Sequence, residues 1–148
     1  MISLVQPNEA SCLPTSFASV LHTKVEDIFD FLGHDGMEML WPELLPPACY
    51  RSFHIQEMYE FALTKNHAVV TLAPLWGQAP DPDHMQPYEC ERLSDYINYY
   101  VGVFSGLTGF GNYHAVAWDG IQMMDPATGK FCTIDFTINH LHIVMKLR

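Results

Sequence analysis

Three side chains in this sequence have the types needed for nucleophilic catalysis: Cys12 near one end, and His114 and Asp125 near the other. A thiolate can attack a carbonyl carbon, and an imidazole can take up and return the proton. A carboxylate can hold that imidazole in one tautomer and one orientation. The three together predict acyl transfer through a thioester, provided that the fold brings them together across most of the chain.

Cys12 lies where a helix is expected to begin. Pro14 has no backbone N–H and is tolerated in the first turn of a helix but not in its interior. The free N–H groups and the dipole at a helix N-terminus favour a thiolate. The alternative for Cys12 is a small buried hydrophobe, the usual role of a free cysteine. The apolar residues that follow are at helical spacing: Leu13, Phe17, Val20 and Leu21.

The stretch YHAVAWDGIQMMDPATG, residues 113–129, predicts a β-hairpin that pairs His114 with Asp125. The dipeptide Asp119-Gly120 is typical of a two-residue type I′ turn. That turn would place His114 directly opposite Asp125, with β-carbons about 4.5–5.5 Å apart on one face of the sheet. Two alternatives are a polar cross-strand pair without catalytic function and a bulge that breaks the register. Turn formation already explains Asp119, so Asp125 is the expected orienting acid.

Gln6 precedes the cysteine by six residues. Its side-chain amide and the backbone N–H of Cys12 are two donors that could stabilise an oxyanion. The alternative is an exposed loop glutamine.

The order of these residues resembles the papain-like cysteine peptidases, most closely the C39 (bacteriocin-processing) group and its C39-like relatives. Their pattern runs Q, C-G-P-[ATS]-[SA], H-[FAY]-V and D-P, and SCLPTSFASVL and YHAVAW…MMDPATG are similar to it over about a quarter of the chain. The resemblance implies a peptidase in which Gln6 is the oxyanion donor and Cys12 the nucleophile. It likewise implies that His114 is the general base and Asp125 the orienter.

Two features depart from that pattern. Leu13 stands where the family usually has glycine, so substrate approach or oxyanion geometry could differ, and the segment 33–87 matches no part of the family. We assign Leu13 to substrate binding together with Trp118, which shares a strand face with His114; the alternative for Trp118 is the core. The same thioester would also serve glutamine deamidation or transglutamination. A further alternative is a papain-fold binding protein without turnover.

The hydrophobic pattern predicts a single α+β domain over residues 1–148, with an N-terminal helical part packed on a C-terminal twisted antiparallel sheet. Two more helices are expected at 25–32 and 55–65, and a short one at 91–99. The segment 77–88 reads as a loop. Strands are expected at 68–76, 100–106, 113–118, 121–125, 131–136 and 141–147.

Composition and charge also indicate which partners, location and bound groups to expect. The net charge of −10 argues against a nucleic-acid partner, and no apolar run is long enough to span a bilayer. No secretory signal is visible, and the four cysteines are widely spaced, so we expect a cytoplasmic protein with Cys49, Cys90 and Cys132 structural. The pair His140 and His142 lacks further ligands in sequence, so we expect no metal and no cofactor. The expected partner is a peptide or protein substrate; the oligomeric state stays open.

Overall fold

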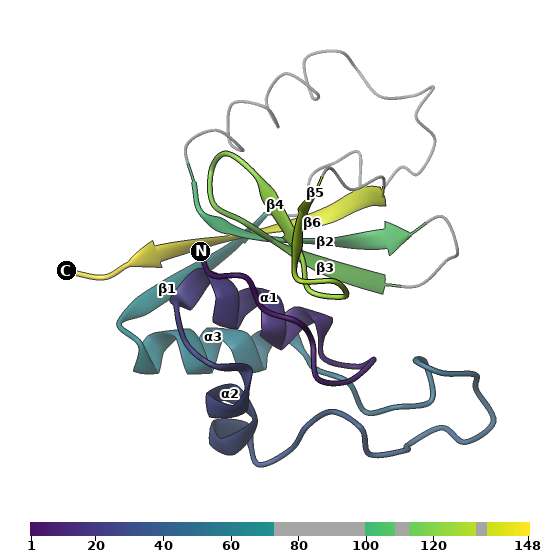
Figure 1. Cartoon of the computed structure of the whole chain (residues 1–148). Helices are drawn as coiled ribbons and strands as arrows, with labels where there is room; N and C mark the ends of the chain where they lie inside the picture. The colour runs from purple at the N-terminus through teal and green to yellow at the C-terminus, as the bar shows by residue number, and fades with distance from the viewer. Residues whose placement is uncertain (73–99, 109–112, 133–135) are drawn as a thin grey trace.

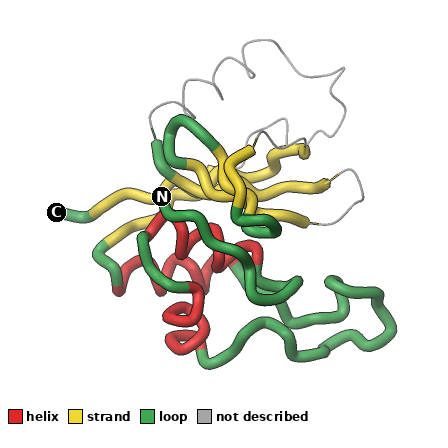
Figure 2. Tube along the Cα trace, viewed as in Figure 1, coloured by secondary structure: helices red, strands yellow, loops and turns green. Residues whose placement is uncertain are grey.

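Helices cover one face of an antiparallel sheet in this protein (Figures 1 and 2). The computed structural model describes residues 1–72, 100–108, 113–132 and 136–148. Within these ranges there are three helices and a six-stranded sheet whose neighbouring strands all run antiparallel. The predicted α+β class is therefore confirmed.

The helices lie close to where the sequence predicts them. They are α1 (Cys12–Leu21), α2 (Val25–Leu32) and α3 (Ile55–Thr64). Helix α1 begins at Cys12 as expected, because Pro14 confines the start of the helix to this turn. Its first backbone hydrogen bond runs from Thr15 N to Ser11 O, 3.0 Å apart. None of the described helices is both long and apolar enough to cross a membrane.

The sheet has the strand order β1-β6-β2-β3-β4-β5. Residues 131–132 end β5 and residue 136 begins β6, so the strand predicted at 131–136 is not one strand. The strand predicted at 141–147 is the end of the longer β6. The predicted helix at 91–99, the loop at 77–88 and the end of the strand at 68–76 lie outside the described residues. The strands are β1 (His67–Leu72), β2 (Gly102–Thr108), β3 (Tyr113–Trp118), β4 (Met123–Asp125), β5 (Lys130–Cys132) and β6 (Phe136–Lys146).

Alternate residues of β3 enter two different hydrophobic clusters. Ala115 and Ala117 pack with Phe17 of α1 on the helix side, whereas Val116 and Trp118 belong to a second cluster. The small alanine side chains let α1 approach the strand closely, and Ser16 Oγ donates a hydrogen bond to Ala115 O at 3.1 Å. This packing brings the N-terminus of α1 beside the start of β3.

The turn between β3 and β4 differs from the prediction. The loop has four residues, 119–122, and Trp118 pairs with Met123 rather than Ile121. Asp119 Oδ1 accepts hydrogen bonds from the backbone N–H groups of Ile121 and Gln122, both at 2.9 Å, and these bonds stabilise the longer loop. The predicted register is therefore wrong by two residues. Because side chains alternate with a period of two, this even shift leaves Asp125 on its predicted face.

Packing of α1 on the sheet can be tested at Phe17, which is fully buried and whose ring centroid lies 6.1 Å from that of His142. Phe17→Ala should lower the free energy of unfolding by about 3–5 kcal/mol, because it leaves a cavity between helix and sheet. Leu63→Ala, at a position 59% exposed on α3, should cost less than about 1 kcal/mol. Urea unfolding followed by circular dichroism measures both, and equal losses would contradict this packing.

Candidate active site

His114 lies between Cys12 and Asp125 in the folded chain. Its Nε2 is 2.8 Å from Asp125 Oδ1, and the Cys12 side chain lies close enough to the ring to raise the pKa of His114 through hydrogen bonding and charge. Since Nε2 contacts Asp125, Nδ1 is the ring nitrogen that is left for the thiol. The predicted contact between His114 and Asp125 is confirmed, although the hairpin reaches it through a different register.

Each of the three side chains stands at the end of an element. Cys12 is the first residue of α1, His114 the second of β3 and Asp125 the last of β4. Asp125 Oδ1 also accepts a hydrogen bond from Ala127 N at 2.9 Å, which fixes the carboxylate. The side chains of His114 and Asp125 are 17% and 23% exposed, so solvent screens their contact only in part.

The environment of His114 favours its protonated form. Burial alone would lower the pKa of His114, but hydrogen bonds to Cys12 and Asp125, with the negative charge of both partners, raise that pKa above its ordinary value. An imidazole that keeps its proton beside a sulfur can stabilise a thiolate through the opposite charge.

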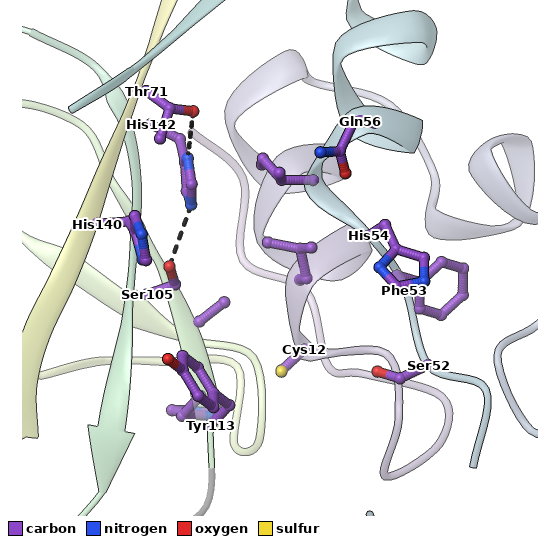
Figure 3. A pocket seen from close by; sticks show the side chains of 14 residues that line it. Cys12, Ser52, Phe53, His54, Gln56, Thr71, Ser105, Tyr113, His140 and His142 are labelled. Atoms are coloured by element: carbon purple, nitrogen blue, oxygen red, sulfur yellow. Dashed lines mark hydrogen bonds between the residues drawn. The ribbon is translucent and has the colours of Figure 1, made fainter. Parts of the chain in front are cut away.

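Two cavities of about 370 and 390 Å³ meet at Cys12. We name them the inner cavity, which continues between α3 and the sheet, and the outer cavity, which continues along the segment 41–51. Figure 3 shows the Cys12 sulfur in the inner cavity, with Ser105 and Tyr113 of the sheet on one side and Ser52 and His54 on the other. The residues that line both cavities are Cys12, Ser52, Phe53, His54 and Tyr113.

The remaining predicted site residues occupy different places. Leu13 lines the inner cavity, and its assignment to substrate binding stays a prediction. Trp118 is only 7% exposed and its ring lies 5.6 Å from that of Phe104. The described lining of the two cavities does not include Trp118, so its burial favours the core alternative.

Gln6 lies beside the end of β4 and is not among the described residues that line the two cavities. Its backbone N–H donates to Pro126 O at 2.8 Å, and its side-chain Nε2 donates to Asn8 O at 3.0 Å. Gln6 Oε1 is buried and accepts no hydrogen bond from the described residues. The amide nitrogen carries two N–H groups, and the assignment of Gln6 as oxyanion donor stays a prediction.

The sequence reasoning missed a polar chain in the wall of the inner cavity. His142 Nδ1 lies 2.8 Å from Thr71 Oγ1, and His142 Nε2 lies 3.1 Å from Ser105 Oγ (Figure 3). Burial, and then the charge of nearby His140, lower the pKa of His142 to about 4. The H-x-H pattern was the available signal, but it indicates metal binding as much as a cavity wall. Within the described ranges, no three His, Cys, Asp or Glu side chains could hold a metal ion.

A scan of the chain against family models finds no match, and searches of curated proteins and of solved structures find none either. The likeness to papain-like peptidases therefore rests on the quoted motifs and stays a proposal.

The charge state of His114 can be measured by NMR titration of the histidine side chains. The pKa of His114 should lie above the ordinary 6.5, and Asp125→Asn should lower it by removing one negative partner. Asp30→Asn, on the exposed side of α2, is the control and should leave it unchanged. A His114 pKa below 6.5, or one that does not change on Asp125→Asn, would contradict the described contacts.

The same contacts predict how folding stability depends on pH. Because the pKa of His114 is raised in the folded state, its contribution to stability is complete below the unfolded-state pKa of about 6.5. The contribution is lost as the pH rises through the higher folded-state pKa.

Proposed function

We propose that this protein is a cysteine-dependent hydrolase that cleaves an amide or peptide bond through a thioester, on a papain-like arrangement of helix and sheet. Cys12 is the nucleophile, His114 the general base and Asp125 the residue that orients it. One observation carries the proposal: His114 contacts both Cys12 and Asp125 at the point where the two cavities meet.

In the proposed reaction the Cys12 proton passes to His114, and the thiolate attacks the carbonyl carbon of the substrate. The oxyanion accepts hydrogen bonds from the Cys12 backbone N–H, in the first turn of α1, and from the Gln6 amide. His114 then protonates the leaving amine as the C–N bond breaks. Water, activated by the now neutral imidazole, hydrolyses the thioester and returns the free thiol. No step requires a cofactor.

The cavities support a substrate that extends on both sides of Cys12. Only the carbonyl carbon beside the sulfur reacts, while the inner and outer cavities offer surface to the chain on either side of it. A peptide or protein segment has this extended shape.

Cys12→Ala should reduce turnover at least about a thousandfold, because the residual activity would lack the nucleophile. Incubation with a synthetic peptide library, read by mass spectrometry, separates the possible reactions. Two shorter peptides indicate hydrolysis, exchange of an amide NH₂ for OH indicates deamidation, and a joined pair indicates transfer to an amine. Leu63→Ala is the control with an intact site. Undiminished cleavage by Cys12→Ala would exclude this mechanism.

Alkylation tests the sulfur without any substrate. Iodoacetamide near neutral pH should label Cys12, which is partly exposed, at least about tenfold faster than an unstructured cysteine peptide. His114→Ala should abolish that advantage, because it removes the positive charge beside the sulfur. Cys49 is the internal control; it is 1% exposed and should react slowly. If Cys12 reacts no faster than the free peptide, a binding protein without turnover becomes the better reading.

A further inference from the structure

The mechanism does not use the polar chain that includes His142, yet this chain forms a wall of the inner cavity. His142 is 3% exposed, and both of its ring nitrogens have hydroxyl partners, Thr71 and Ser105. Tyr59 OH forms a further hydrogen bond with Thr71 Oγ1. A neutral imidazole satisfies these contacts with one N–H and one lone pair. These hydrogen bonds therefore hold His142 uncharged in the wall of the inner cavity, in agreement with its lowered pKa.

Apart from Cys12 and His114, the pair that reacts, the rest of the described lining is also without a carboxylate, ammonium or guanidinium group. No Asp, Glu, Lys or Arg is among the described residues around the inner cavity. The apolar part of its surface comes from Leu13, Phe53, Ile55 and Ala115. Gln56, in the first turn of α3, adds a neutral amide to the lining (Figure 3).

The outer cavity is different, because charged residues line it. Glu9 and Arg51 are both part of its wall. The Glu9 side chain forms a hydrogen bond with Tyr50, and Arg51 Nη1 lies 3.4 Å from Glu38 Oε2. Among the described residues, Asp, Glu, Lys or Arg side chains therefore line the outer cavity but not the inner cavity.

We propose that the inner cavity binds a large uncharged side chain of the substrate next to the bond that reacts, and that it rejects the charged analogue of that side chain. The inference rests on the proposed function, which makes Cys12 the reacting group. Glutamine is the natural side chain that tests it best, because glutamate has the same shape and differs in its charge.

The physical reason for this selection is desolvation. A carboxylate or ammonium group that enters the part of the inner cavity lined by Thr71 and His142 loses water and meets no Asp, Glu, Lys or Arg among the described lining residues. A carboxamide loses less on leaving water and can exchange hydrogen bonds with the Gln56 amide and with hydroxyl groups. Discrimination of about 10- to 100-fold is expected from such a difference.

The test measures binding separately from turnover. Immobilised Cys12→Ala protein is incubated at about pH 8 with a peptide library randomised among glutamine, glutamate and lysine. Mass spectrometry of the retained peptides should show glutamine enriched at least about tenfold over both charged residues at one position. Equal retention of the three, or no retention above that of a blank column, would overturn the inference.

A charge placed in the lining should reverse the selection. Gln56→Glu in the Cys12→Ala protein should favour lysine over glutamine at that position by at least about threefold, since it adds a carboxylate at the cavity. Gln122→Glu is the matched control: it makes the same charge change in the exposed loop between β3 and β4 and should leave the selection as it was. An equal response to both substitutions would show that overall charge, not the inner cavity, decides.

Comparison with the wild-type protein separates the two proposals. If wild-type protein cleaves glutamine and glutamate peptides equally well, the inner cavity does not select and the hydrolase proposal stands. If Cys12→Ala protein retains glutamine peptides selectively but wild-type protein cleaves none of them, the binding inference stands and the hydrolase proposal fails.

Discussion

Close packing of α1 on β3 is the constraint on which the site depends. The alanines at 115 and 117 leave room for the helix, and the buried hydrogen bond from Ser16 to Ala115 O fixes its position along the strand. A larger residue at either alanine would push the helix away from the sheet. The distance from the helix N-terminus to the start of β3 is set in this way, and with it the contact between Cys12 and His114.

Charge is distributed unequally around His114 and His142, two of the four histidines in the described lining of the inner cavity. His114 has a carboxylate and a thiol as partners, and these outweigh the effect of burial, so its pKa rises. His142 has only hydroxyl partners and a neighbouring imidazole, so burial dominates and its pKa falls to about 4. The pKa values of two imidazoles in one cavity are therefore shifted in opposite directions because their neighbours differ.

Features that depend on residues close together in the sequence were predicted more accurately than features that depend on residues far apart. Val25–Leu32 was predicted to the residue, and the start of α1 followed from Pro14, because helical spacing and proline geometry act within one or two turns. The β3–β4 register was missed by two residues, since the Asp119 side chain stabilises a longer loop than Asp-Gly normally forms. The predicted contact between His114 and Asp125 is present all the same, because a shift by an even number of residues leaves a side chain on the same face of the sheet.

By itself the sequence determined the start of α1 at Cys12, the α+β order of elements and the face shared by His114 and Asp125, because each follows from backbone sterics or strand alternation nearby in the chain. Only the tertiary structure decided which residues surround the sulfur. Ser52 and His54 come from a segment without periodicity, and Thr71 and Ser105 reach His142 through strands far apart in sequence. No local rule brings them together, because their positions follow from packing of the whole sheet against the helices.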